Sequence, residues 1–213
     1  MTSTVRRKPG RPKLVNGDTS TAHAILEKAA ELFMNYGYEG VSVERVAEEC
    51  NLTKASIYYH FANKASLFTA SMIHLMNLIE NQVKDILSKD MPFLDRLYEI
   101  SLAYLKIAEP RMEFSTLMRE AKPLLSRQQL RRMKESEERL ATALAHAIQE
   151  TQESQAKAYV DPYLAAKVYQ ALLPLGRLKL ANGAAYFSTA EQAASEVVHI
   201  TARVLGFSFQ TIE

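Results

Sequence analysis

Apolar side chains recur along most of the chain with the spacing expected for helices that are apolar on one face. The first such stripe is formed by positions 25, 29, 32, 33 and 36, which share one face of a helix. We expect this helix to begin after Thr21 as its N-cap and to end at Gly37. No segment longer than a few residues alternates with the period of a β-strand, so the sequence predicts an all-α protein.

The next part of the pattern contains two short helices that are separated by a break at Asn51-Leu52. The first is expected to start after Ser42 and to span about two turns, and the second to run from about Thr53 to His60. Helices as short as these make poor cores by themselves. Three helices of which the last two are joined by a tight turn are typical of a helix-turn-helix, whose final helix enters the major groove of DNA.

The rest of the chain is expected to be helical as well, which gives about nine helices in total. Asn63 favours the start of a long fourth helix as its N-cap, and the apolar stripes predict helices at about 64–87, 94–108, 111–122, 126–152, 161–181 and 189–205. Pro174 lies inside the eighth of these helices and predicts a kink there.

The third predicted helix carries a run of ring side chains, and a helical wheel divides them between two faces. With Ile57 at the centre of the buried face, Tyr59 lies about 160° away on the opposite face. The outward surface is small, aromatic and hydroxylated: Ala55 and Tyr59 are flanked there by Ser56 and Tyr58, and Lys54 stands at the N-terminus of the helix. Such side chains suit base edges and phosphates, so we interpret Tyr59 as a DNA contact rather than an incidentally exposed aromatic. His60 faces partly inward, and both a packed ring and a phosphate contact remain open for it.

Two further positions around this helix suit phosphate binding. Lys64 follows the predicted cap Asn63, at a helix start where free N–H groups and the helix dipole favour an anion. Ser42 caps the second helix and can bind a phosphate in the same way. Alone, either residue is interpreted as part of an ordinary solvated helix cap. Because both lie beside the same recognition helix, we interpret them together as a phosphate clamp.

Basic residues are concentrated at the N-terminus, although the net charge of the whole chain is only +2. Residues 1–19 hold five basic side chains against one acidic side chain and show no apolar periodicity, which predicts a disordered basic arm. The segment KPGRPK within it resembles the Gly-Arg-Pro core of an AT-hook, in which Arg11 would enter a narrow A·T-rich minor groove. A tail that adds only non-specific DNA affinity is the alternative.

The segment AAELFMNYGYEGVSVERVAEECNLTKASIYYHFANKASLF resembles the DNA-binding domain of the TetR family of bacterial transcriptional regulators. The features that carry the resemblance are Phe33, Gly37-Tyr38, Ser42-Val43, Ala47, the stretch LTKASIYYHF, and Lys64 with Leu67-Phe68. The resemblance implies a DNA-binding domain at residues 20–68, followed by a helical effector-binding and dimerisation domain at 69–213. The DNA-contact positions that it implies are Ser42, Thr53, Lys54, Ala55, Ser56, Tyr58, Tyr59, His60 and Lys64.

The C-terminal part, from about residue 70, carries 17 basic and 17 acidic residues and is not expected to bind DNA. Its last two helices are rich in small residues, so two copies can pack them into a four-helix bundle; the homodimer would read a palindromic operator. In the family, a cavity among the middle helices binds a small effector. The candidate lining here is Met72, Met76, Tyr104, Phe114, Met118 and Tyr169. Ordinary core packing is the alternative for these six.

Several classes of function lack support in the sequence. The single Cys50 excludes an internal disulfide, and no apolar run approaches the ~20 residues that span a bilayer, so we expect a soluble cytoplasmic protein with no membrane partner. No catalytic constellation is recognisable, and His74, His146 and His199 are isolated. We therefore expect no enzyme activity, no metal site and no cofactor.

These observations favour a sequence-specific DNA-binding transcriptional regulator, a repressor that a small-molecule effector releases from a palindromic operator. A ligand-independent DNA-binding or architectural regulator is one alternative, favoured if the C-terminal part is solidly packed. An enzyme with an acquired helix-turn-helix is another, and the missing catalytic constellation argues against it.

Overall fold

The computed structural model describes residues 18–107, 114–154 and 160–207, and within these ranges the regular elements are helices. They are α1 (Asp18–Tyr36), α2 (Val43–Glu49), α3 (Lys54–His60), α4 (Lys64–Leu87), α5 (Phe93–Lys106), α6 (Phe114–Ala121), α7 (Arg127–Ser154), α8 (Pro162–Leu172) and α9 (Ala190–Leu205). Two short 3₁₀ helices, η1 (Lys122–Leu124) and η2 (Leu173–Arg177), follow α6 and α8. The all-α prediction is confirmed.

Side-chain caps fix the starts of several helices where the sequence predicted them. In each case the cap side chain accepts a hydrogen bond from the backbone N–H three residues later, which satisfies one of the free donors of the first turn. The caps with their N···O distances are Ser42 before α2 (3.1 Å), Thr53 before α3 (3.1 Å), Asn63 before α4 (2.8 Å) and Thr189 before α9 (3.1 Å).

Two helix ends differ from the prediction. Helix α1 begins at Asp18, so Thr21 lies within its first turn and is not its N-cap, and residues 18 and 19 of the predicted arm are helical. The helix begins about two turns before Ile25, the first residue of its apolar stripe, so the stripe placed its start too late. The eighth helix ends at Leu172 instead of about residue 181. Pro174 follows directly, and because it has no N–H and its ring crowds the preceding turn, the α-helix stops there rather than kinking.

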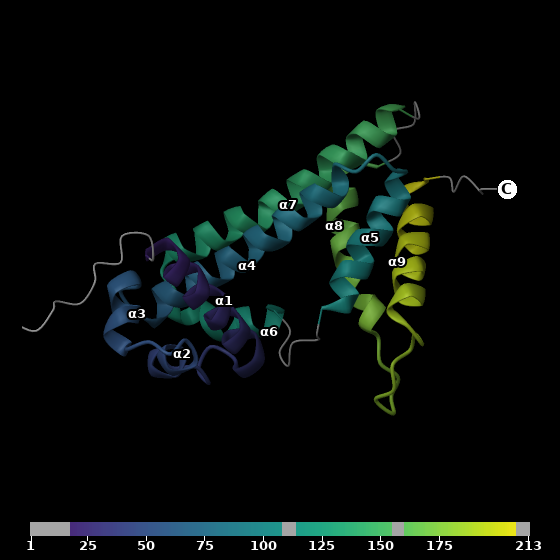
Figure 1. Cartoon of the computed structure of the whole chain (residues 1–213). Coiled ribbons are helices and arrows are strands. Elements are labelled where there is room, and N and C mark those ends of the chain that lie inside the picture. Colours follow the sequence, from purple (N-terminus) through teal and green to yellow (C-terminus); the bar gives the residue numbers. More distant parts are fainter. Residues whose placement is uncertain (1–17, 108–113, 155–159, 208–213) are drawn as a thin grey trace, which may run out of the picture.

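The chain between α8 and α9 forms a short hairpin after η2. Tyr186 donates its backbone N–H to Leu178 O at 2.8 Å, and Leu180 donates to Ala184 O at 2.8 Å. Gly183 supplies the left-handed residue of the turn, with φ of 82°. Figure 1 shows this hairpin extending away from the helices that it connects.

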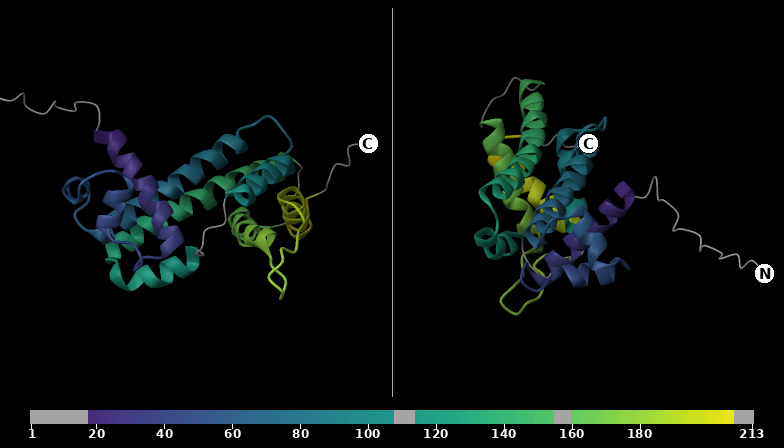
Figure 2. Two further views of the ribbon diagram at one scale, coloured as in Figure 1. Left: turned by 60° about the horizontal axis from the view of Figure 1, so that its bottom comes forward. Right: turned by 90° about the vertical axis from the view of Figure 1, so that its left-hand side faces the viewer.

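The helices are arranged around a long pair formed by α4 and α7. Figure 1 shows these two side by side, and α4 packs extensively on both α7 and α1. Helices α1–α3 gather around the start of α4, whereas α5, α8 and α9 pack together near the other end, as the left view of Figure 2 also shows. One long helix therefore leads directly from the helix-turn-helix into the rest of the protein.

The apolar interior consists of two hydrophobic clusters. In the first, the Phe68 ring meets Phe33 and Tyr38 edge to face, with centroids 5.0 and 5.1 Å apart. This cluster also includes Leu117 and Met133 of α6 and α7. The second lies among α4, α5, α7, α8 and α9 around residues such as Leu97, Leu144 and Tyr169. The domain boundary predicted at residues 68 and 69 falls within α4 and stays a prediction.

None of the helices in the described ranges is both long and apolar enough to span a membrane.

Candidate nucleic-acid interface

A tight turn sets helix α3 against α2. Asn51 occupies the left-handed region with φ of 53°, a conformation that asparagine tolerates better than most residues. The chain is held across the turn by the hydrogen bond from Leu52 N–H to Ala47 O, at 2.8 Å. Thr53 then starts α3 and also places its hydroxyl 2.8 Å from that of Ser56. Local chemistry therefore fixes the direction of this short helix.

The two faces of α3 have the orientations that the helical wheel predicted. Ile57 is fully buried in the first cluster, whereas Tyr59 is 76% exposed and Tyr58 is 44% exposed. Ala55 is also exposed. An aromatic ring as exposed as that of Tyr59 is free to bury its surface against a partner. Its contact with DNA stays a prediction.

His60 takes an intermediate position at the end of α3. Its ring is half-buried between two neighbours, 5.0 Å from the Tyr59 ring in an edge-to-face contact and 6.1 Å from the Phe61 ring. The packed-ring interpretation fits this environment. A phosphate contact by the same ring remains a prediction.

The two lysines at predicted DNA-contact positions are each held by an acidic side chain and an aromatic ring. Lys54 of α3 forms an ion pair with Glu44 of α2, and its Nζ lies 5.6 Å from the centroid of the Tyr58 ring. The hydrogen bond within this ion pair lowers the pKa of Glu44 and raises the pKa of Lys54. Lys64 Nζ lies 4.4 Å from the centroid of the Tyr38 ring and 3.6 Å from a carboxylate oxygen of Glu39.

Sequence reasoning missed Glu39, Glu44 and Arg45 as members of this surface. Glu44 stands in the first turn of α2, where an acidic residue is ordinary, so nothing local marks it as a partner of Lys54. Arg45 stacks its guanidinium 3.7 Å from the centroid of the Tyr36 ring. Its spacing from Tyr36 carries no helical signal, because the turn between α1 and α2 separates the two residues.

The residues predicted to line an effector cavity are divided between different parts of the structure. Met72, which is fully buried, packs in the first cluster with the half-buried Phe114 and Met118. Tyr169 is fully buried in the second cluster, where its hydroxyl donates to Leu97 O at 3.0 Å. Burial raises the pKa of this phenol. The structure therefore brings three of the predicted residues together and places Tyr169 elsewhere.

The other two predicted cavity residues belong to neither of the two hydrophobic clusters. Tyr104 of α5 is half-buried beneath Arg177, whose guanidinium lies 4.5 Å from the ring centroid and donates to the Tyr104 carbonyl at 2.6 Å. Met76 is half-buried on α4, one turn after Met72. Arg11, the predicted minor-groove residue, lies outside the described residues.

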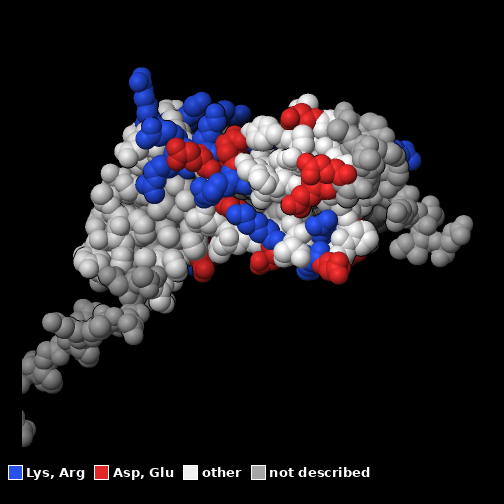
Figure 3. Space-filling model, turned by 90° about the horizontal axis from the view of Figure 1, so that it is seen from above, with Lys and Arg blue, Asp and Glu red and all other residues white. Residues whose placement is uncertain are grey.

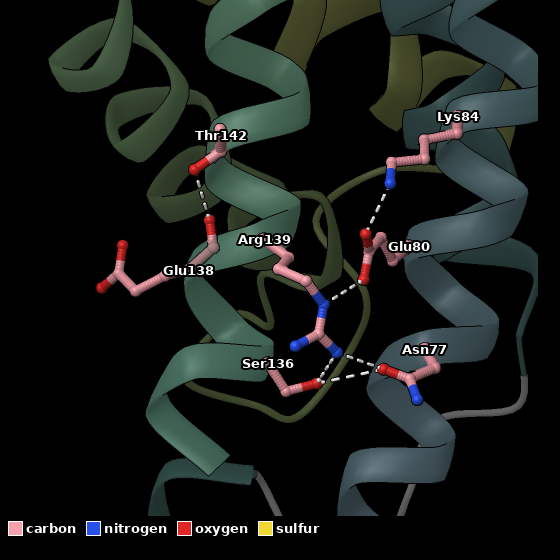
Figure 4. Close-up of polar contacts among 7 residues, drawn as sticks. All are labelled: Asn77, Glu80, Lys84, Ser136, Glu138, Arg139 and Thr142. Carbon is pink, nitrogen blue, oxygen red and sulfur yellow. Dashed lines mark hydrogen bonds and ion pairs between the residues drawn. The ribbon is translucent and has the colours of Figure 1, made fainter. Parts of the chain in front are cut away.

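A charged groove runs between α4 and α7 and has a volume of about 760 Å³. Figure 3 shows acidic and basic side chains interspersed over this face, and none of the six predicted cavity residues lines the groove. At its floor Glu80, 5% exposed, accepts hydrogen bonds from Lys84 Nζ at 2.7 Å and Arg139 Nε at 2.9 Å (Figure 4). The hydrogen bond from Lys84, supported by that from Arg139, lowers the pKa of Glu80. This network ties α4 to α7.

Within the described part of the chain, no three histidine, cysteine or acidic side chains gather in an arrangement that could hold a metal ion.

Sequence comparison places the similarity to known proteins at the N-terminal end. Residues 25–70 match the family described as bacterial regulatory proteins of the tetR family. The negative transcriptional regulator IcaR of the biofilm operon icaADBC in Staphylococcus aureus is 30% identical over 87 residues, which are 41% of this chain and 47% of IcaR. The matched segment thus spans about half the length of this curated relative.

Solved structures resemble the chain over most of its length. A TetR-family transcriptional regulator from Mesorhizobium loti superposes with a TM-score of 0.64 at 19% identity, covering 88% of this chain and 97% of that one. AibR, solved in complex with isovaleryl coenzyme A and operator DNA, gives a TM-score of 0.63 at 24% identity and covers 84% and 97%. At these identities the likeness concerns the fold.

Proposed function

Because the helix-turn-helix domain of this chain belongs to the TetR family of bacterial regulatory proteins, we propose that the chain is a sequence-specific transcriptional repressor. The observation that carries the proposal is the surface of α3. It is anchored from one side by the buried Ile57 and presents Ala55, Tyr58 and Tyr59 outward. A short helix held in this way can enter the major groove while the rest of the domain contacts the backbone.

The DNA contacts that we propose are the nine positions of the helix-turn-helix surface, together with Arg11 of the N-terminal segment. Ser42, Thr53 and Lys64 stand at or beside helix starts, where N–H groups can bind phosphate. Lys54, Ala55, Ser56, Tyr58, Tyr59 and His60 belong to α3. Phosphate contacts would set the position of the helix, and contacts to base edges would supply specificity.

The proposed repressor acts as a homodimer formed through α8 and α9. Ile200 and Val204 on α9 are 42% and 55% exposed, and a second copy would cover them. Buried alanines such as Ala193 and Ala194 let neighbouring helices approach closely. A two-fold dimer would present two copies of α3 to a palindromic operator, with half-sites about 34–36 Å apart.

The proposal further includes release of the repressor from its operator by a small molecule. AibR has been solved with isovaleryl coenzyme A and operator DNA together. In this chain Met72 of α4 shares a hydrophobic cluster with Phe114 and Met118 of α6, and α4 carries Lys64 at its start. A ligand among them would release the operator only if it bound the DNA-free arrangement more tightly than the DNA-bound one.

A regulator without an effector is the second candidate function. The full burial of Met72 and Tyr169 within packed clusters favours it, since neither side chain borders open space. Operator affinity measured with and without a compound shown to bind the full chain separates the two candidates. Tight binding that leaves operator affinity unchanged would support the ligand-independent regulator.

Selection of binding sites from a pool of random DNA duplexes tests the proposed function directly. We expect the full chain to enrich a palindrome whose half-site centres are about 10–10.5 base pairs, or a multiple of this spacing, apart. Footprinting on the enriched sequence would then locate the protected phosphates. A pool that shows no enrichment over several rounds would rule out sequence-specific binding.

Replacing Lys64 with alanine should weaken binding to all DNA sequences by a similar factor. Lys64 stands at the start of α4 and is proposed to contact a phosphate, which carries no sequence information. The slope of log affinity against log salt should therefore fall in magnitude by about one. The measurement is fluorescence anisotropy of operator and random-sequence duplexes over a series of salt concentrations. A loss confined to the operator would assign Lys64 to base recognition instead.

A further inference from the structure

The helix-turn-helix domain is acidic on balance, which is unusual for a surface that meets DNA. Residues 20–69 contain four basic side chains, Lys28, Arg45, Lys54 and Lys64, and six acidic ones, Glu27, Glu31, Glu39, Glu44, Glu48 and Glu49, giving a net charge of −2. Proteins that bind nucleic acid ordinarily present a basic patch to it. The few cations of this domain therefore supply its positive side-chain charge toward phosphate, in addition to the N–H groups at its helix starts.

Three of these four cations are already paired with glutamate. Lys28 contacts Glu31 at 2.5 Å, Lys54 forms its ion pair with Glu44, and Lys64 Nζ lies 3.6 Å from Glu39. The second and third of these pairs involve the lysines at proposed phosphate-contact positions. Glu44 reaches Lys54 from α2, and Glu39 reaches Lys64 from the turn before α2. Both pairs are thus made across the fold rather than along one helix.

The two pairs are accessible to solvent, and hence to DNA. The side chains of Lys54 and Glu44 are 51% and 49% exposed, and those of Lys64 and Glu39 are 27% and 74% exposed. A phosphate that approaches either lysine must therefore displace a carboxylate or bind beside it. In both cases the glutamate opposes binding, by competition for the lysine or by repulsion of the phosphate.

We propose that Glu39 and Glu44 are positioning residues that hold Lys64 and Lys54 in the free protein and thereby weaken its binding to DNA of any sequence. The proposal rests on the proposed function, because it takes the two lysines as phosphate contacts. It assigns to the glutamates a part in setting the affinity of the regulator. They act through the lysines and need not touch DNA themselves.

Each lysine also contacts an aromatic ring, so the proposal can be tested by removing the charge of its glutamate. Lys64 Nζ lies over the Tyr38 ring at 4.4 Å, and Lys54 Nζ lies 5.6 Å from the Tyr58 ring. A cation–π contact needs only the ammonium group and the ring, and not the carboxylate. Each lysine would therefore stay near its place when its glutamate is replaced by the isosteric, neutral glutamine.

The experiment compares Glu39→Gln, Glu44→Gln and the double variant with Glu48→Gln as a matched control. Glu48 is exposed on α2 one turn after Glu44 and forms no ion pair with any described residue, so its replacement changes the net charge equally. Affinity is measured on random-sequence duplex and on the selected operator, between about 50 and 200 mM salt. Circular dichroism of each full-length variant confirms that the fold is retained.

We expect each single variant to bind both duplexes roughly two- to tenfold more tightly than the parent protein, with the larger gain at low salt. The control should change affinity by less than about twofold. In a Lys54→Ala background the gain from Glu44→Gln should fall to that of the control, because the lysine through which Glu44 acts is gone.

Three results would overturn the inference while leaving the proposed function intact. The first is the absence of any gain in DNA affinity from Glu39→Gln and Glu44→Gln. The second is an equal gain for Glu39→Gln, Glu44→Gln and Glu48→Gln, which would reduce the effect to net charge. The third is a gain from Glu44→Gln that persists in full without Lys54. If the parent protein binds neither duplex, the proposed function itself fails, and the inference falls with it.

Discussion

Replacing Tyr59 with alanine should weaken binding to the selected operator by roughly 1–3 kcal/mol, or about 5- to 150-fold, while leaving the fold intact. Tyr59 is 76% exposed on the outer face of α3 and supports none of the apolar core. Its ring would be buried only in the complex, so its removal affects the bound state alone. The measurements are operator affinity by fluorescence anisotropy and thermal unfolding by circular dichroism.

Tyr186→Ala is the matched control for this prediction. Tyr186 is also an exposed tyrosine, at 58%, but it lies on the hairpin between α8 and α9, far along the structure from α3 (Figure 1). Its replacement should leave operator affinity within about twofold of the parent value, because it lies outside the proposed interface. Unfolding of the Tyr59→Ala protein, or equal losses for the two variants, would contradict the assignment of α3 as the recognition helix.

Replacing Phe68 with alanine should lower the free energy of unfolding by about 3–5 kcal/mol. Phe68 is fully buried, and its ring meets Phe33 and Tyr38 edge to face. The substitution removes most of a large apolar side chain and leaves a cavity that the rigid helices around it can close only in part. Such a loss is a large fraction of the stability of an ordinary domain. Urea titration followed by circular dichroism measures it.

Phe61→Ala provides the comparison on the same cluster. Phe61 follows α3 and is half-buried against the first cluster, so it removes less apolar surface from water than Phe68 does. Phe61→Ala should lower the free energy of unfolding by no more than about half as much as Phe68→Ala does. Equal destabilisation by the two substitutions would contradict the prediction that the buried aromatic contacts of Phe68 contribute more to stability than the half-buried Phe61 does.

Much of the proposed DNA-binding surface is predictable from the sequence because its determinants are local. A cap such as Thr53 acts on an N–H three residues away, and the helical period alone places Tyr59 opposite Ile57. The same is true of the all-α class and of the starts of α2, α3, α4 and α9. The DNA contacts of these residues remain predictions that the experiments above address.

The residues predicted to line an effector cavity could not be assigned to a cavity or to the core from the sequence. Methionine and aromatic side chains at helical spacing fit a cavity lining and an ordinary core equally well. Only the packing of the helices places Met72 in the cluster around Phe68 and Tyr169 in the other cluster, hydrogen-bonded to Leu97. The charged groove between α4 and α7 likewise depends on how two helices far apart in the chain lie together.

The sequence by itself determined the helix-turn-helix, its caps and the outward direction of Tyr59, because each depends on residues within a few positions of one another. The tertiary structure alone decided that Lys54 meets Glu44 and that Lys64 meets Glu39. These partners are brought together by the turns between helices, and no helical or strand period relates them. The charge of the proposed interface therefore depends on contacts between different helices and turns. The sequence pattern describes each of these elements separately and does not show which of them meet.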